Sequence, residues 1–465
     1  MSPSLPQPFG DLAPPRRAHL VGILGSGMQS LAALLLQHGW QLTGSDANPR
    51  AGRQCRQAFP GVTFYGAHAA ENVPVDCELV IHTAAVPSEN PELSAARRRG
   101  VPVCSYVDML AALMSTRFGV SIAGTHGKSS TTAMVQSILE AAARPSISLF
   151  GAQPIKAPQS VPLTNGPEDV CVVESCEFRS HFLRLRPKLI CLTGIEPDHF
   201  DCFATIESAR AAYARFLNLL PSNGILVFNA SDNSARELAE SVSCQTVSYS
   251  RHDSAADWSA TRIEQQGGRL CLKHQNREVG AVDWNQWGLH QIDNGLAAAA
   301  TCSAMGVPVE NIVQGLSAFA GLRRRLEPRG CVNGVRYFDD YAHHPTAIQS
   351  VLESVLARFT GEKAKLWVVF QPHQANRTRH LMQEFANSLT LADEVFILPV
   401  FGARESASTE FVELAKQLTL HVQRLGTPAS FVPGFADLQQ LLTTSPSAGD
   451  TVLTLGAGDI DQIYL

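Results

Sequence analysis

The chain has 465 residues, of which 45% are hydrophobic and 17% are charged, and its formal net charge is −5. A chain of this length is too long for one ordinary hydrophobic core, so two or three domains are expected, and the acidic balance disfavours a nucleic-acid partner. Eleven dispersed cysteines without a Cys-x-x-Cys pair are typical of reduced thiols in a cytoplasmic protein. We expect the proline-rich residues 1–17 to form a disordered lead, and we expect no membrane association because no apolar run is long enough to cross a bilayer.

The first region begins with a strand, a glycine-rich turn and a helix. The apolar run 18–23 leads into Gly22-Ile23-Leu24-Gly25-Ser26-Gly27-Met28, and after the helix a second strand ends at Asp46. Glycines at such a turn let a diphosphate approach the helix N-terminus, and a carboxylate at Asp46 can accept hydrogen bonds from ribose hydroxyls. Thr83 and Ala84 close a later strand at the edge where such sheets bind ligands. The G-x-x-G-x-G spacing does not separate NAD from another nucleotide diphosphate, and a Rossmann-like domain without a ligand is the alternative.

The second region opens on the stretch with the most specific motif in the chain. A short apolar strand precedes Gly124-Thr125-His126-Gly127-Lys128-Ser129-Ser130, and apolar residues at helical spacing follow it. In a phosphate-binding loop, backbone N–H groups and the helix N-terminus face the anion, the lysine reaches the outer phosphates, and the next hydroxyl ligates Mg²⁺. Ile122 stands where the common form of the motif has glycine. A glycine-rich turn with a surface lysine is the alternative interpretation.

Polar residues follow the later strands of this region. Glu174 ends the strand 170–174, and Glu196-Pro197-Asp198-His199-Phe200-Asp201 follows the strand 189–193. Carboxylates and an imidazole beside a phosphate loop predict metal and phosphate binding, with a helix-capping loop as the alternative. Residues 224–285 are expected to be rich in strands. Asn294, near the start of an alanine-rich helix, can pair with an adenine edge or cap its helix.

The last region is predicted to be a third α/β domain of parallel type, with a strand followed by a loop over 335–346 and further strands at 366–370, 395–398 and 451–455. Its arginine, histidine and tyrosine residues follow the strand ends, where open sheets bind ligands. The adjacent side chains of His343 and His344 are expected to diverge instead of forming a metal pair.

These regions together predict a reaction with three substrates. A carboxylate anion and an ammonium cation do not condense usefully in neutral water, and ATP overcomes this by phosphorylating the carboxylate, which an amine then attacks. Phosphoryl transfer depends mainly on positioning and on charge neutralisation by lysine and Mg²⁺. The predicted fold is α/β with three domains: Rossmann-like at 18–115, a P-loop ATPase-like mixed sheet at 116–327, and Rossmann-like at 328–465.

From about Ala18 to Leu465 the chain resembles the Mur ligase family. The motifs that carry the resemblance are Gly124 to Lys128, Glu174 to Glu177, Glu196 to His199, Arg324 to Glu327, Asp339 to Thr346, Gln371 to His373 with Arg377-Thr378, and Gly456 to Asp459. The sequence departs from the family's motifs at Cys176, Arg179, Gly194, Gln291, Gln374 and Ala375. These departures leave the choice among alanine, serine and glycine open.

The resemblance implies an ATP- and Mg²⁺-dependent ligase that joins a free amino acid, expected to be L-alanine, to UDP-N-acetylmuramate in cytoplasmic peptidoglycan precursor synthesis. It implies a monomer or homodimer. Catalytic roles are implied for Lys128, Glu174, His199 and His343, and Mg²⁺ ligation for Ser129, Glu174 and His199. Nucleotide contacts are implied for Gly124, Thr125, Gly127, Lys128, Ser129, Ser130, Asn294, Arg325 and Asp340. Substrate contacts are implied for Gly25, Ser26, Gly27, Met28, Asp46, Thr83, Ala84, Tyr341, His343 and Arg377.

Three other functions remain as alternatives at this point. A recycling ligase that adds a tripeptide to the same sugar nucleotide shares the run from His343 to Ile348. An NAD-dependent oxidoreductase would account for the first region but leave the Lys128 loop unexplained. An ATP-gated binding protein without catalysis would account for Cys176 and Gly194.

Overall fold

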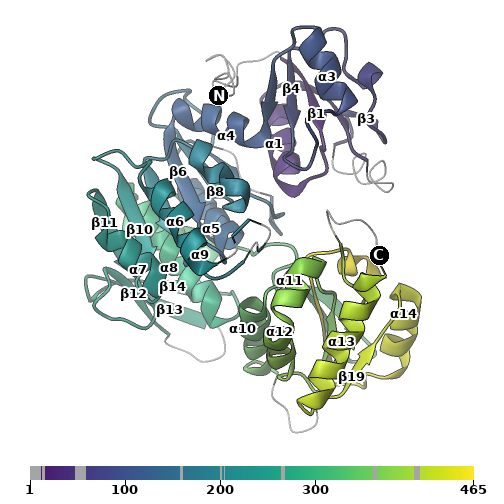
Figure 1. Ribbon diagram of the computed structural model, residues 1–465. Helices are drawn as coiled ribbons and strands as arrows, with labels where there is room; N and C mark the ends of the chain where they lie inside the picture. The colour runs from purple at the N-terminus through teal and green to yellow at the C-terminus, as the bar shows by residue number, and fades with distance from the viewer. Residues whose placement is uncertain are drawn as a thin grey trace.

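The computed structural model describes residues 12, 16–47, 59–157, 161–198, 200, 202–203, 205–262, 268–359, 364–402 and 409–464. Three separate sheets organise these residues. Figure 1 shows them as three lobes, with the N-terminal lobe in purple and blue, the central lobe in teal and the C-terminal lobe in green and yellow. The predicted α/β class with three domains is confirmed, whereas the boundaries at residues 115/116 and 327/328 stay predictions.

The N-terminal sheet is fully parallel, with strand order β3-β2-β1-β4-β5. Its elements are β1 (Arg17–Val21), α1 (Ser26–Gln37), β2 (Gln41–Ser45), β3 (Thr63–Tyr65), η2 (Ala70–Asn72), β4 (Leu79–His82), α3 (Pro91–Arg98), β5 (Val103–Ser105) and α4 (Tyr106–Ser115). The order of strands reverses between β1 and β4, and the glycine-rich turn follows β1 at that point, where open sheets bind ligands. β5 begins at Val103, and the carbonyl of the preceding Pro102 accepts from the Val80 N–H.

Leu12 lies within the segment that we expected to be disordered, and it does not fit that expectation. Its side chain is 1% exposed, and its carbonyl accepts a hydrogen bond from the Trp40 indole at 3.3 Å. Residues 1–11 and 13–15 lie outside the described residues.

A buried carboxylate braces the end of β2, next to Asp46. Glu92 accepts hydrogen bonds from Ser45 at 2.7 Å and Asn72 at 2.6 Å, and His19 lies 3.5 Å away. Burial favours the neutral acid, but the contacts with His19, Ser45 and Asn72 outweigh it and lower the pKa of Glu92 to about 2. Glu92 therefore fixes the strand end that presents Asp46.

We expect this network to make the N-terminal domain sensitive to acid. The folded pKa lies below the ordinary value of 4.5, so the stabilisation is complete above about pH 4.5 and is lost as the pH falls toward 2. The contribution is on the order of 3 kcal/mol. The protection of the β1 and β2 amides, measured by hydrogen–deuterium exchange and corrected for the intrinsic exchange rate at each pH, should therefore fall between pH 5 and pH 3 in the wild type. Glu92→Gln should be less protected at neutral pH and respond less to acid. Identical pH profiles for the two proteins would contradict this role for Glu92.

The central sheet has nine strands in the order β14-β13-β12-β11-β10-β9-β6-β8-β7. Its elements are β6 (Phe118–Ala123), α5 (Lys128–Ala141), β7 (Ser146–Leu149), β8 (Val170–Ser175), η3 (Phe178–Arg184), β9 (Leu189–Leu192), α6 (Ile206–Leu217), β10 (Ile225–Asn229), α7 (Asn233–Glu240), β11 (Gln245–Tyr249), β12 (Trp258–Arg262), β13 (Gly268–His274), β14 (Arg277–Trp284), α8 (Leu289–Ala304) and α9 (Val309–Ala318). The strands from β7 to β12 pair in parallel, and β13 and β14 add an antiparallel edge. This is the mixed sheet that the sequence predicted.

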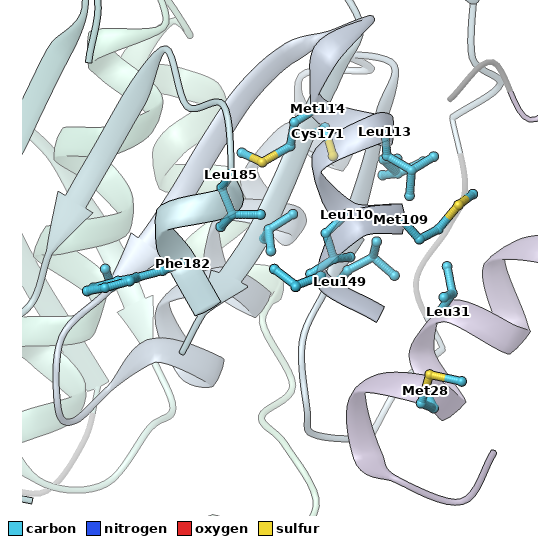
Figure 2. Close-up of a cluster of buried hydrophobic side chains, with 14 of the residues drawn as sticks. Met28, Leu31, Met109, Leu110, Leu113, Met114, Leu149, Cys171, Phe182 and Leu185 are labelled. Atoms are coloured by element: carbon cyan, nitrogen blue, oxygen red, sulfur yellow. The ribbon is translucent and has the colours of Figure 1, made fainter. Parts of the chain in front are cut away.

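Two hydrophobic cores cover the two faces of this sheet. Along β8, Val170 and Val172 pack with α5, α8 and α9, whereas Cys171 and Val173 face the other core, as the two-residue period of a strand requires. The core that contains Cys171 and Val173 also includes residues of the N-terminal domain. Figure 2 shows Met28 and Leu31 of α1 near Met109 and Leu113 of α4, with Cys171 and Leu149 of the central sheet beyond them. Helix α4 thus packs against both domains.

The C-terminal sheet has the order β15-β16-β20-β17-β18-β19. Its elements are β15 (Glu327–Val332), β16 (Val335–Asp340), α10 (Pro345–Leu356), β17 (Leu366–Phe370), α11 (Ala375–His380), α12 (Met382–Leu389), β18 (Glu394–Ile397), α13 (Glu410–Arg424), β19 (Ala429–Phe431), α14 (Phe435–Thr444), β20 (Thr451–Leu455) and η4 (Ile460–Tyr464). The strands from β16 to β19 pair in parallel, as predicted, and β15 adds an antiparallel edge that was not expected, because it pairs with β16 across a tight turn at Asn333-Gly334. Among the described residues of the whole chain, no helix is long and apolar enough to cross a membrane.

Candidate active site

The three domains meet around one cavity of about 1850 Å³. It is lined by residues from all three domains, and most of the predicted nucleotide and amino-acid contacts reach it. The predicted residues on its wall are Ser26, Thr125, Gly127, Lys128, Ser129, Ser130, Glu174, Asn294, Arg325, Asp340, Tyr341, His343 and Arg377. Residues far apart in the chain are thus brought together in the arrangement that a reaction with several substrates requires.

The loop between β6 and α5 has the geometry of an anion cradle. Gly127 is the N-cap residue of α5 and has a φ of +78°. No side chain caps the first N–H groups of this helix. A Cβ at Gly127 would lie 2.2 Å from Asn294 Oδ1, and a Cβ at Gly124 would lie 2.1 Å from Thr193 Oγ1. Both positions therefore require glycine, and Asn294 of α8 lies directly against the loop. The N–H groups at the start of α5 could therefore bind an anion, which is what the predicted phosphate site requires.

Lys128 is folded back onto this loop. Its Nζ donates to the carbonyls of Gly124 at 2.5 Å and Thr125 at 3.1 Å and to Glu177 at 3.3 Å. Burial disfavours the ammonium, but the negative charge of Glu177 and neighbouring acidic groups outweighs this effect and raises the pKa of Lys128 above its ordinary value. The side chain is therefore charged at neutral pH and is held at the mouth of the cradle.

The residues beside the cradle fit a magnesium ion. Ser129 Oγ lies 2.9 Å from Glu174 Oε2, and the same oxygen accepts from the Gly151 N–H at 2.8 Å. Adjacent oxygen ligands of an octahedral Mg²⁺ are about 2.9 Å apart, so the hydroxyl and the carboxylate already have a suitable spacing. The predicted third ligand, His199, lies outside the described residues, as does Asp201.

Ser26 connects this site to the N-terminal domain. A Cβ at Gly151 would lie 3.0 Å from Ser26 Oγ and 3.7 Å from Glu174 Oε2, so Gly151 is the point where the first glycine-rich turn approaches the predicted metal ligands. The N-terminus of α1 at Gly25 has no side-chain cap. This juxtaposition was not predicted, because Gly151 belongs to no motif.

The other predicted residues of the N-terminal domain do not line the cavity. They are Gly25, Gly27, Met28, Asp46, Thr83 and Ala84. The Met28 side chain is 2% exposed within the core, so only its backbone is available to a ligand. A Cβ at Gly27 would lie 2.8 Å from the Tyr106 ring, which gives this glycine a packing role, and a Cβ at Gly22 would lie 2.4 Å from Thr83. Asp46 accepts a hydrogen bond from the Leu24 N–H at 3.1 Å and thereby shapes the turn.

Arg323, Arg324 and Arg325 all line the cavity, and Arg325 is the one to which the resemblance assigns a nucleotide contact. The Arg324 guanidinium donates hydrogen bonds to the Asp339 carboxylate at 3.0 Å and to the carbonyls of Gly456 and Gly458. Arg325 lies over the Tyr341 ring at 5.2 Å. Burial raises the pKa of Asp340 to about 6, with the positive charge of Arg325 opposing the shift, and its carboxylate accepts from the backbone of Leu326 and Ala342.

An ion pair crosses from the central domain to the predicted amino-acid pocket. Arg377 is 4% exposed, and its Nε and Nη2 donate to Asp198 Oδ1 at 2.9 and 2.7 Å. Its Nη1 lies 3.2 Å from His373 Nδ1. Sequence reasoning assigned Asp198 to metal and phosphate positioning and did not find this pairing, because 179 residues separate the partners.

His343 and His344 diverge as predicted. His343 Nδ1 lies 2.8 Å from the Tyr341 carbonyl, and its ring contacts His373. Burial, followed by the charge of Arg377, lowers the pKa of His343 well below its ordinary value, so the ring is neutral. His344 points instead toward Glu196 and Pro197.

Comparisons with known proteins place the chain among ligases. Three family models match consecutive segments: "Mur ligase family, catalytic domain" at residues 17–118, "Mur ligase middle domain" at 122–302 and "Mur ligase, glutamate ligase domain" at 324–458. A relative from Acetivibrio thermocellus named UDP-N-acetylmuramate–L-alanine ligase is 33% identical and covers 96% of this chain and 94% of its own. A protein of the same name from Salinibacter ruber is 35% identical, with 96% and 93% of the two chains covered.

Solved structures agree on the fold. The UDP-N-acetylmuramate–alanine ligase of Thermotoga maritima superposes with a TM-score of 0.77 at 24% identity, covering 96% of this chain and 97% of that one. A murein peptide ligase from Psychrobacter arcticus gives a TM-score of 0.71 at 26% identity, with coverage of 96% and 97%.

Proposed function

This chain belongs to the Mur ligase family, and we propose that it joins L-alanine to the lactyl carboxylate of UDP-N-acetylmuramate while ATP is converted to ADP and phosphate. The names of the full-length relatives support this reaction, which belongs to cytoplasmic peptidoglycan precursor synthesis. The observation that carries it is the cavity in which the Lys128 cradle, the Ser129–Glu174 pair and the Arg377 side chain face one space. Tripeptide addition has less support, because these relatives are named for alanine.

The first chemical step would take place against the cradle. A carboxylate oxygen attacks the terminal phosphorus, the bond to ADP breaks, and an acyl phosphate forms. Lys128 and the N-terminal amides of α5 would stabilise the charge on the transferring group, as phosphoryl transfer requires. A magnesium ion held by Ser129 and Glu174 would neutralise further phosphate charge.

The second step would take place on the side of the C-terminal domain. The ammonium first gives a proton to solvent. The free amine then attacks the acyl carbon, the bond to the phosphate oxygen breaks, and the second nitrogen proton leaves with the released phosphate as the amide forms. Arg377 would bind the carboxylate of the amino acid. The neutral ring of His343 would accept a hydrogen bond from the ammonium instead of repelling it. The domain arrangement would also shield the acyl phosphate from water.

We expect Arg377→Lys to weaken binding of the amino acid specifically. Lysine keeps the positive charge but cannot form the paired hydrogen bonds of a guanidinium, so the KM for alanine should rise roughly tenfold to a hundredfold while the KM for ATP changes little. Steady-state kinetics with each substrate varied in turn measures this. Arg379→Lys is the matched control, because Arg379 lies on the same helix, is half-exposed and pairs with Glu410. An unchanged KM for alanine in Arg377→Lys would remove Arg377 from the amino-acid pocket.

The proposed function is tested by one substrate panel. Purified protein is incubated with ATP, Mg²⁺ and UDP-N-acetylmuramate plus alanine, serine, glycine or the tripeptide, and the product is identified by mass. We expect the alanyl product to form fastest. A tripeptide product formed in its place would favour the recycling reaction, and phosphate release without any amide product would contradict both.

A further inference from the structure

Three side chains from different loops converge on the wall of the cavity that faces the C-terminal domain. They are His126 of the phosphate loop, Glu196 after β9 and His344 at the N-terminus of α10, and one ligand atom from each lies within 4.8 Å of the others. His126 Nε2 is 3.2 Å and His344 Nδ1 is 3.8 Å from the same oxygen of Glu196. This cluster is not needed for the reaction proposed above.

The hydrogen bonding of His344 leaves a lone pair facing a carboxylate. Its Nε2 lies 3.1 Å from the Pro197 carbonyl, which only accepts, so Nε2 carries the proton. Its Nδ1 is buried and has no hydrogen-bond partner, and the side chain is 7% exposed. Burial and the nearby His126 lower the pKa of His344, so the ring is neutral and Nδ1 is unprotonated.

The facing carboxylate is ionised. Burial favours neutral Glu196, but the contacts with His126 and a hydrogen bond from Thr346 at 2.8 Å outweigh it and lower the pKa to about 2. A buried lone pair and a carboxylate oxygen 3.8 Å apart repel each other, and a cation between them would relieve this repulsion.

We propose that His126, Glu196 and His344 bind a divalent transition-metal ion of the zinc class, at a site separate from the Ser129–Glu174 pair. Two imidazoles and one carboxylate are a common donor set for Zn²⁺, whereas Mg²⁺ prefers oxygen alone. Tetrahedral zinc ligands lie about 3.3 Å apart. His126 and Glu196 already have this spacing, whereas His344 lies 3.8 Å from Glu196 and within 4.8 Å of His126 and would move closer on binding.

The surroundings of the cluster support ligation. The hydrogen bond from His344 to the Pro197 carbonyl fixes the ring tautomer, as is usual for a metal-bound histidine. Thr346 orients the carboxylate. His126 would ligate through Nε2 with its proton on Nδ1. Since His344 belongs to the C-terminal domain and the other two to the central domain, a bound ion would tie the two domains together two residues from Lys128.

The site is tested on the untagged, full-length protein after treatment with a chelator. Co²⁺ is titrated in the presence of excess Mg²⁺, followed by Zn²⁺ as competitor. We expect one equivalent of Co²⁺ with ligand-field bands of nitrogen and oxygen ligands, without the sulfur charge-transfer bands that cysteine ligands would give, and its displacement by Zn²⁺. His344→Ala should weaken binding at least tenfold.

Two further variants separate metal ligation from altered folding. Glu196→Gln keeps the shape of the side chain and should also weaken binding at least tenfold. His421→Ala removes an imidazole from α13, which does not line the cavity, and should bind Co²⁺ like the wild type. Saturable binding that persists unchanged in both His344→Ala and Glu196→Gln, sulfur bands in the spectrum, or no binding in excess Mg²⁺ would each overturn the proposal.

Discussion

Replacing Lys128 with alanine is expected to reduce the rate of amide formation by at least roughly a thousandfold while leaving the fold intact. The ammonium is charged, it is held by the carbonyls of Gly124 and Thr125, and it is within reach of a phosphate bound at the N-terminus of α5. Its removal takes away the positive charge that would stabilise the transferring phosphoryl group, and no other lysine among the described residues lines the cavity. Product formation measured by mass against time gives the rate.

Circular dichroism and thermal unfolding of Lys128→Ala show whether the variant is still folded. Its circular dichroism should stay close to that of the wild type, whereas its thermal midpoint should fall, because the largely buried ion pair with Glu177 is lost. Lys416→Ala, which removes an exposed lysine from α13, is the matched control and should retain full activity. If Lys128→Ala kept near-normal turnover, the assignment of the phosphate loop would be wrong.

Glu174→Gln is expected to reduce turnover by roughly a hundredfold to a thousandfold and to raise the concentration of Mg²⁺ required. Glutamine has the size of glutamate and can still accept from Ser129 and Gly151, but it lacks the charge that attracts the ion. The measurement is the dependence of the rate on Mg²⁺ at saturating ATP.

Excess Mg²⁺ distinguishes a metal ligand from a merely structural residue. It should restore part of the activity of Glu174→Gln, which a structural defect would not permit. Glu240→Gln, an exposed position at the end of α7, should behave as the wild type. A Glu174→Gln protein with wild-type Mg²⁺ dependence would show that Glu174 does not hold the ion.

Much of the fold follows from local pattern. The strand–turn–helix units at β1–α1 and β6–α5 and the buried apolar strands were readable because their signals lie within a few consecutive residues. The antiparallel β15 was missed, because its strand reads Glu-Pro-Arg-Gly-Cys-Val, with little of the apolar alternation that identifies a strand.

The site could be predicted from sequence only where the residues lie within one short motif, because the spacing within the motif fixes their relative positions. The spacing of Gly127 and Lys128 fixes their relation to a helix N-terminus, so the cradle could be expected from sequence. The pairing of Arg377 with Asp198 and the approach of Ser26 to Gly151 depend on how domains pack, and no local pattern encodes that. Likewise, His344 is the neighbour of His343 in the chain, but its side chain lies near Glu196 in the folded protein.

The central claim is that the cradle around Lys128 activates a carboxylate by transferring phosphate to it. The most direct measurement uses UDP-N-acetylmuramate whose lactyl carboxylate carries a heavy oxygen isotope, with ATP, Mg²⁺ and alanine, and reads the mass of the inorganic phosphate released. An acyl phosphate passes one carboxylate oxygen to the phosphate, so the account predicts one labelled oxygen in each phosphate formed along with amide. Amide formation that leaves the phosphate unlabelled would contradict it.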